Sequence, residues 1–201
     1  MNCDPIARWY RWLEYIGFGG ALQQRRTAFL KDVATARRAL VLGEGDGRFL
    51  VKLVEQNRSA SIDYVDLSER MLQLARERAG TTQVTYRRGD ALTLPLPVAE
   101  YDLITTHFFL DCLNQADAAV LVDRVSGATA PHAQWLVSEF QDTMAASRAI
   151  VALLYFFFRI TTGLATRRLI DHRPLLEDAG FRLKRRETAR FGLLVSELWI
   201  R

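Results

Sequence analysis

The sequence contains few of the residues that define several large protein classes. Only two of its 201 residues are cysteines, Cys3 and Cys112, and they lie far apart. Their number and spacing argue against a disulfide framework and against a zinc site, so we predict no metal. We therefore expect a protein that works in a reducing, cytoplasmic compartment.

Long hydrophobic runs are also missing. The longest one, residues 149–158, ends at Arg159, whereas a membrane span needs about 18 apolar residues. The first ten residues include Asp4 and Arg8, which argues against a signal peptide. Hydrophobic residues make up 49% of the chain and charged residues 25%. These values are typical of a folded globular protein, and the length suits one domain.

Lysine is scarce, because only three of the 27 basic residues are lysines and arginine supplies most of the net charge of +4. The basic residues are scattered, apart from one modest cluster of Arg182, Lys184, Arg185, Arg186 and Arg190. A solvated strand face explains this cluster better than a nucleic-acid footprint does. We expect no DNA partner, and RNA is only a remote alternative.

Short β-like runs alternate with helical segments along the chain, which predicts an α/β fold with a mainly parallel sheet. We expect strands at 38–43, 61–66, 83–87, 101–107 and 133–140, and helices at 46–57, 68–79 and 115–128, with Ser68 as an N-cap. The ends differ from this core. Residues 5–32 and 143–170 look like helical additions. We expect a short helix at 175–181, stopped by Gly180, and an antiparallel hairpin formed by 182–190 and 192–200.

The first predicted strand runs into three alternating glycines, in the stretch ALVLGEGDGRFL at residues 39–50. In a doubly wound sheet, ligands bind beyond the carboxyl ends of the strands, and glycines allow close approach to the backbone. A tight β-to-α connection is the alternative. Asp66 ends the second strand and Asp90 follows the third, where carboxylates can accept from ribose hydroxyls and from an exocyclic amine. Either aspartate alone is equally compatible with a helix cap or a turn, but together they indicate a nucleoside pocket.

A dinucleotide site is a weaker interpretation. Its fingerprint is G-x-G-x-x-G, whereas these glycines are spaced G-x-G-x-G and are followed by Arg48, Phe49 and Leu50. No small residue is left for the close helix-to-strand packing that the last glycine of that fingerprint permits.

Several stretches resemble successive motifs of the class I S-adenosylmethionine-dependent methyltransferases, and most of all the branch of ubiquinone and menaquinone biosynthesis. They are VLGEGDGRF, IDYVDLSERMLQLARERA, VTYRRGDALTLPLPVAEYDLITTHFFLDCL and RPLLEDAGF. The resemblance implies S-adenosylmethionine as cosubstrate and a Rossmann-like, doubly wound seven-stranded sheet of order 3-2-1-4-5-7-6. It also implies one domain over 1–201, with an N-terminal helical lid (1–36), a cofactor-binding core (37–142), a helical insertion (143–171), and a helix with the C-terminal hairpin (172–201).

The same resemblance assigns roles to single residues. The methionine part of the cofactor would be surrounded by Gly43, Glu44, Gly45 and Gly47, and its sulfonium would lie beside His107. The ribose would be held by Asp66. The adenine would contact Leu67 and Met71, and its amino group would bind Asp90 and Ala91. One position departs from the family pattern. Val41 stands where an acidic residue is usual, and Glu44 or Asp46 is the candidate replacement.

Methyl transfer is an in-line displacement, so the main task of the protein is to position donor and acceptor. A base is needed only if the acceptor loses a proton. His107 and Asp111 are the candidate catalytic residues; a cofactor-wall role is the alternative for His107. Glu139 either faces the pocket or makes a structural hydrogen bond.

The acceptor is expected to be small and apolar or aromatic. The tetrad [N/D]-P-P-[Y/F], typical of enzymes that methylate amino groups in nucleic acids, is replaced by the stretch THFFLD. Aromatic residues crowd the N-terminal extension and the insertion, and we expect Tyr10, Phe108 and Tyr155 to line the acceptor pocket. The exposed part of the run YFFF at 155–158 also suits contact with a membrane surface. A degenerate cofactor-binding interaction protein is the alternative function.

Overall fold

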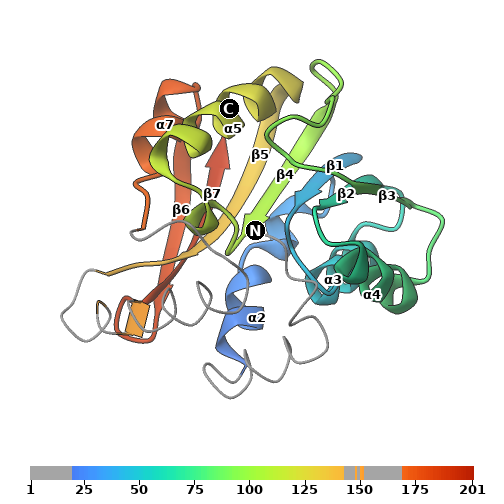
Figure 1. The fold of residues 1–201 in the computed structure, drawn as a ribbon, viewed down its shortest axis with the longest axis horizontal. Helices are drawn as coiled ribbons and strands as arrows, with labels where there is room; N and C mark the ends of the chain where they lie inside the picture. Colours follow the sequence, from blue (N-terminus) through green and yellow to red (C-terminus); the bar gives the residue numbers. More distant parts are fainter. Residues whose placement is uncertain (1–19, 143–147, 149, 152–168) are drawn as a thin grey trace.

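Seven strands form a single mixed sheet in the computed structural model of the chain, which describes residues 20–142, 148, 150–151 and 169–201 (Figure 1). The order across the sheet is β3-β2-β1-β4-β5-β7-β6. Strands β1 to β5 run parallel, and β7 is antiparallel to both of its neighbours, β5 and β6. This arrangement confirms the predicted fold class and strand order.

The strands coincide closely with the apolar runs of the sequence. They are β1 (Arg38–Leu42), β2 (Ser61–Asp66), β3 (Val84–Arg88), β4 (Tyr101–His107), β5 (Thr129–Phe140), β6 (Arg182–Ala189) and β7 (Leu194–Ile200). The central strands are buried on both faces, which explains why they read as continuous apolar runs rather than as alternating ones.

Helices cover both faces of the sheet. The 3-10 helix η2 (Leu30–Val33) and the helices α3 (Arg48–Gln56) and α4 (Glu69–Ala79) pack on one face through Phe49, Leu50 and Leu72. Helices α5 (Gln115–Ala128) and α7 (Arg173–Asp178) pack on the other. Helix α4 begins at the predicted cap, because the Ser68 hydroxyl oxygen accepts from the Met71 backbone N–H.

Most observed boundaries lie within one or two residues of those predicted from the sequence, and two of the differences have a clear structural cause. Strand β5 begins at Thr129 rather than at residue 133, because the β4–β5 register shifts between Tyr101 and Leu103 and a bulge containing His132, at φ +63°, extends the strand. Helix α7 begins at Arg173 rather than at 175, because a proline occupies its first turn, where the missing N–H costs nothing.

The carboxyl ends of β1 to β5 define one edge of the sheet, which we call the carboxyl edge. Helix α2 (Ala21–Arg26) lies there, beside the β6–β7 turn, and its Leu22 packs against Leu193 and Leu194 (Figure 1). The small 3-10 helix η3 (Leu110–Cys112) follows β4 at the same edge.

Several expectations lie outside the described residues. They concern most of the N-terminal lid and of the helical insertion, including Tyr10, Tyr155 and the YFFF run. Among the described residues, no helix is long and apolar enough to span a membrane.

Candidate functional site

The glycine loop joins β1 to α3 at the carboxyl edge. Gly43, Gly45 and Gly47 all have positive φ, at +59°, +89° and +81°, a region that side chains with a Cβ rarely adopt. A Cβ on Gly47 would lie 2.6 Å from the Ala75 Cα, so this glycine lets α3 and α4 approach. A Cβ on Gly43 would lie 2.1 Å from the Phe109 ring, which therefore covers the start of the loop.

The two acidic side chains of the loop, Glu44 and Asp46, bond to other groups of the protein. Asp46 is buried and forms ion pairs of 2.9 Å with Arg48 and Arg78, which tie the loop to α3 and α4. Glu44 is also buried, and it accepts from the Phe49 backbone N–H at 3.1 Å. The structure therefore gives both candidate replacements for the missing acid at Val41 a role in holding the loop.

The Glu44 carboxyl also meets the hydroxyl of Tyr64, which lies 2.9 Å from Glu44 Oε2 and 2.8 Å from the Gly45 carbonyl oxygen. Burial raises the pKa of Glu44 to about 7, and the nearby charge of Arg26 opposes this rise. Tyr64 is the β2 neighbour of Val41 in the sheet. An acid at Val41 would thus face the phenol that now holds Glu44.

Arg26 is a residue of the site that no sequence pattern singles out. This residue ends α2, and its side chain is buried at the carboxyl edge. Its guanidinium lies 5.1 Å from the centroid of the Phe108 ring and is close enough to lower the pKa values of Glu44 and His107. A buried cation beside the glycine loop suits an anionic group such as the carboxylate of an amino acid. The only signal in the sequence is the QQRR run, which gives no indication of burial.

The turn after β2 carries the predicted ribose site. Asp66 Oδ1 accepts from the Ser68 backbone N–H at 2.8 Å, while Ser68 itself caps α4. Leu67 presents an exposed side chain, whereas Met71 is buried in the core beneath it. The Asp66 carboxylate is partly exposed, so it remains accessible to a ligand.

The turn after β3 lies next to it, because the Gly89 N–H donates to the Asp66 carbonyl at 3.1 Å. Asp90 is exposed and accepts from the Leu92 N–H at 2.9 Å. Ala91 is buried against the α5 face. A further bond of 2.9 Å, from the Gly43 N–H to the Val65 carbonyl, holds the glycine loop against β2. The structure thus brings Gly43, Asp66 and Asp90 to one stretch of the edge.

His107 ends β4 on the face that carries α3. Its ring lies edge-on to Phe49 and is 3% exposed. Burial, reinforced by the charge of Arg26, lowers the pKa of His107 to about 3, so the imidazole is neutral at physiological pH. This desolvation makes His107 a poor base, in contrast to what its ordinary pKa suggests.

Hydrogen-bond counting fixes the tautomer of His107. Its Nδ1 lies 3.0 Å from the Ser138 hydroxyl oxygen, and that hydroxyl donates to the Arg25 carbonyl at 3.0 Å. With the Ser138 proton assigned to the Arg25 carbonyl, Nδ1–H is the donor to Ser138. The Nε2 lone pair then has no hydrogen-bond partner among the described residues, although it is buried. It is a ready acceptor for a ligand N–H or O–H.

A pair of buried carboxyls lies on the opposite face, behind η3. Glu139 accepts from the backbone N–H groups of Phe109, Leu110 and Asp111 at 2.9–3.3 Å. A further hydrogen bond joins its side chain to that of Asp111. Burial raises the pKa of both groups, to about 6 for Asp111, and two hydrogen-bonded carboxyls share one proton. Of the two roles considered for Glu139, the structure shows the structural hydrogen bond.

The segment after β4 is held under strain by these contacts. Phe108 has φ +54° although it carries a bulky side chain. Its ring stacks beside Phe140 with centroids 5.1 Å apart and belongs to the cluster that joins α2 to β7. Phe108 therefore lies next to Arg26, on the side of α2, where we predict the acceptor pocket.

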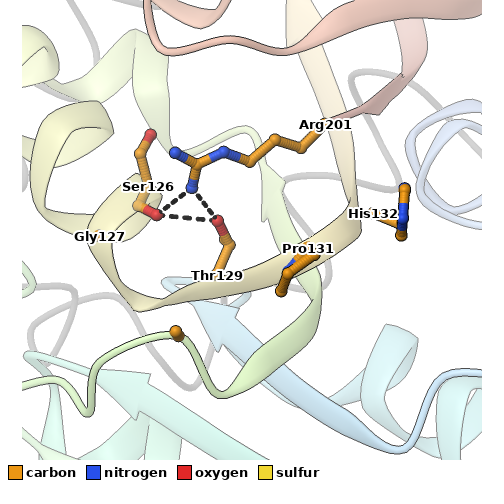
Figure 2. A pocket seen from close by; sticks show the side chains of 7 residues that line it. Ser126, Gly127, Thr129, Pro131, His132 and Arg201 are labelled. Carbon is orange, nitrogen blue, oxygen red and sulfur yellow. Dashed lines mark hydrogen bonds between the residues drawn. The ribbon is translucent and has the colours of Figure 1, made fainter.

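One further pocket belongs to another part of the molecule. A cavity of about 550 Å³ is lined by Ala99, Ser126, Gly127, Thr129, Pro131, His132 and Arg201 (Figure 2). It lies where β4 and β5 begin, at the edge opposite the glycine loop. Its only arginine is already bound to the Thr129 hydroxyl and to the Ser126 carbonyl (Figure 2). This cavity therefore takes no part in the site.

Comparison with known proteins identifies the class. Residues 39–132 match the family model described as a methyltransferase domain. The demethylmenaquinone methyltransferase of Deinococcus radiodurans is 33% identical over 135 residues, which are 66% of this chain and 55% of that protein. The protein of the same name from Thermus thermophilus is 29% identical over 144 residues, 70% of this chain and 64% of that protein. The chain spans less than two thirds of the length of these curated relatives.

The fold is shared with solved methyltransferase structures. The structure of mitomycin 7-O-methyltransferase superposes with a TM-score of 0.73 and 20% identity, over 98% of this chain and 58% of that one. The architecture is thus that of the Rossmann-like methyltransferases. Together with the matched domain, it makes this chain similar to the class I S-adenosylmethionine-dependent methyltransferases, with the menaquinone methyltransferases among its relatives.

The described residues fit S-adenosylmethionine. Arg26 is a cation for the carboxylate, the positive-φ glycines allow close approach to the backbone, and Asp66 is a carboxylate for the ribose. Leu67 is exposed beside Asp66, as an adenine contact requires. The Phe109 ring lies across Gly43 and must shift or stack as the cofactor enters.

Proposed function

We propose that this protein transfers a methyl group from S-adenosylmethionine to a small lipophilic acceptor that carries a hydroxyl group on an aromatic ring. The observation that carries the proposal is the buried Nε2 lone pair of His107, which lacks a partner among the described residues at the carboxyl edge. Leaving a buried acceptor unpaired is costly. A donor hydroxyl on the acceptor molecule removes that cost only when the substrate is in place.

The cofactor would be held by the turns after β1, β2 and β3, with one residue each from α2 and α4. Gly43, Glu44, Gly45 and Gly47 form the floor under its methionine part, Arg26 pairs with its carboxylate, Asp66 binds the ribose, Leu67 and Met71 form the adenine wall, and Asp90 and Ala91 bind the adenine amino group. When bound, S-adenosylmethionine supplies an electrophilic methyl group, and its methyl–sulfur bond breaks as the methyl–acceptor bond forms. Every other task falls to the protein.

The protein positions the acceptor and removes its proton. His107 Nε2 accepts the hydrogen bond of the acceptor hydroxyl and orients it, but with a pKa of about 3 it does not retain the proton. Asp111, which follows β4 in η3 and has a pKa raised to about 6 by burial, is the proposed final acceptor of that proton near neutral pH; because it lies on the other face of the sheet, the proton would reach it through water. His107 and Asp111 thus have separate roles, one in orientation and one as base.

The lipophilic character of the acceptor is supported by its surroundings and by the relatives. Phe108 borders the site on the side of α2, and Tyr10 and Tyr155 are proposed to complete the pocket. The two curated relatives are named for demethylmenaquinone, whose reduced form carries hydroxyls on an aromatic ring. A reduced naphthoquinone is therefore the first acceptor to test.

The test uses the full chain and methyl-labelled S-adenosylmethionine. A reduced naphthoquinone and its dimethyl ether, which has no hydroxyl proton, form a matched pair of acceptors. We expect label in the first compound and none in the second. Equal labelling of both, or labelling of neither while a carboxylic acid or an amine is methylated, contradicts the proposed acceptor class.

A further inference from the structure

The turn between β6 and β7 contains an aromatic residue in an unfavourable place. The Leu193 N–H donates to the Arg190 carbonyl at 3.1 Å, so Phe191 and Gly192 are the central residues of a four-residue turn. Both have positive φ, at +54° and +82°. Such hairpin turns favour Asn-Gly, and a bulky residue with positive φ is an outlier. Phe191 is also 90% exposed, so packing within the protein does not explain it.

The strand leading to this turn is unusually open and basic. Residues 182–186 and Arg190 are exposed, and this edge strand carries four basic residues and one acidic residue, with Arg190 following it in the turn. Arg185 and Arg186 are partly neutralised, by Asp32 and by Glu197. Arg182 and Lys184 have no ion pair with any other described residue, so a surplus of positive charge remains along the strand.

The sheet topology puts the Phe191 turn at the carboxyl edge. Strand β7 is antiparallel to β5 and to β6, so β6 ends where β1 to β5 end, on the side of the proposed methyl-transfer site. The base of the turn is also packed onto that site. Leu193 and Leu194 belong to the same cluster as Leu22 of α2, with Phe108 packed against it.

We propose that the β6–β7 turn docks the protein on an anionic lipid bilayer, with the Phe191 ring inserted at the headgroup boundary and the basic β6 strand facing the lipid phosphates. A single exposed ring flanked by arginines suits a bilayer interface better than a protein partner, which would offer a pocket to a larger apolar patch. The Phe191 ring and the basic residues of β6 act together, because neither one inserted ring nor a few basic residues would anchor a protein to a membrane alone. Docking holds the carboxyl edge toward the membrane. This orientation would help a lipophilic acceptor to enter the site, an advantage that rests on the proposed function. The docking itself does not depend on that function.

Phe191→Asn separates docking from folding. Asparagine adopts positive φ readily and forms the favoured Asn-Gly pair, so this variant should melt at a higher temperature than the wild-type chain. Its binding to vesicles of phosphatidylcholine and phosphatidylglycerol, measured by co-sedimentation, should fall about tenfold. Val98→Asn is the matched control, because Val98 is 82% exposed but lies in the loop before β4, at the opposite edge of the sheet.

The outcomes separate docking from the other proposals. Binding that requires phosphatidylglycerol, survives Val98→Asn and is lost in Phe191→Asn supports docking, even if no acceptor is ever methylated. Equal vesicle binding by the two variants overturns it, as does a wild-type chain that binds single-stranded RNA but not vesicles. Titration with S-adenosylhomocysteine should give the same affinity for all three proteins, so a failure of cofactor binding would count against the proposed function alone.

Discussion

The Tyr64 hydroxyl oxygen lies between the Glu44 carboxyl, at 2.9 Å, and the Gly45 carbonyl, at 2.8 Å. A phenol has only one proton, and the carbonyl can only accept it. The phenol therefore donates to Glu44 or to Gly45 at any one time, and a protonated Glu44 satisfies both contacts by donating its own proton to the Tyr64 oxygen. The pKa of about 7 for Glu44, raised first of all by burial, is consistent with a proton held there.

Glu44 should give the stability of the protein a specific pH dependence. A carboxyl with a folded pKa above its ordinary value of 4.5 stabilises the protein fully below pH 4.5 and loses this contribution as the pH rises through about 7. The difference corresponds to about 3 kcal/mol. Glu44→Gln keeps both hydrogen bonds without titrating. In urea unfolding from pH 5 to 8, the variant should therefore lose about 3 kcal/mol less than the wild-type chain. Parallel curves for both proteins would contradict a protonated Glu44.

Asp66 and Ser68 lie two residues apart but should differ in their effects. Asp66→Asn is expected to weaken S-adenosylhomocysteine binding about tenfold or more, because a charged acceptor of the ribose hydroxyls is lost. Ser68→Ala removes the cap of α4 and should cost about 1 kcal/mol of stability, with the affinity unchanged. Calorimetric titration and thermal unfolding of both variants check this. Equal losses of affinity would mean that Asp66 acts only through the turn.

His107 should affect turnover rather than cofactor binding. His107→Phe keeps an aromatic ring against Phe49 and removes the Nε2 acceptor, so kcat should fall about 100-fold while the affinity for S-adenosylhomocysteine changes little. Nitrogen NMR should show a neutral imidazole protonated at Nδ1 from pH 5 to 8. A signal from the other tautomer would contradict the hydrogen-bond assignment. Ser196→Ala is the control, because Ser196 shares the Arg25 carbonyl with Ser138 but does not contact the ring.

The Asp111–Glu139 pair should control the pH–rate profile. A base must be ionised, so kcat should rise as the pH increases through about 6, the pKa of Asp111. Asp111→Asn should lower kcat and remove this rise. Asp117→Asn, in the first turn of α5 and bonded to Asn114, should leave the profile unchanged. An unaltered profile in the Asp111 variant would assign the base to another group.

Much of the fold could be predicted from the sequence, because it depends on local patterns. Strands β2 and β4 have the predicted bounds, since each is a short run rich in β-branched and aromatic residues. The early start of β5 was missed, because Thr129 joins the strand only through a bulge that depends on the partner strand. A single sequence carries no signal for such a register shift.

The site likewise contains residues that could be predicted from the sequence and contacts that could not. The glycines, Asp66, Asp90 and His107 follow predicted strands, and the sheet brings them together as the topology requires. The burial of Arg26, the bond from Tyr64 to Glu44 and the three N–H groups held by Glu139 were not predictable. Each depends on contacts between residues about 20 to 80 positions apart in the sequence.

The most direct measurement is calorimetric titration of the full chain with S-adenosylmethionine and S-adenosylhomocysteine, beside an Arg26→Gln variant. The account predicts saturable binding of both compounds to the wild-type chain and weaker binding to the variant, because the carboxylate loses its cation. Absence of binding to the wild-type chain, with its fold intact by circular dichroism, would contradict the central claim that the carboxyl edge is a methyl-donor site.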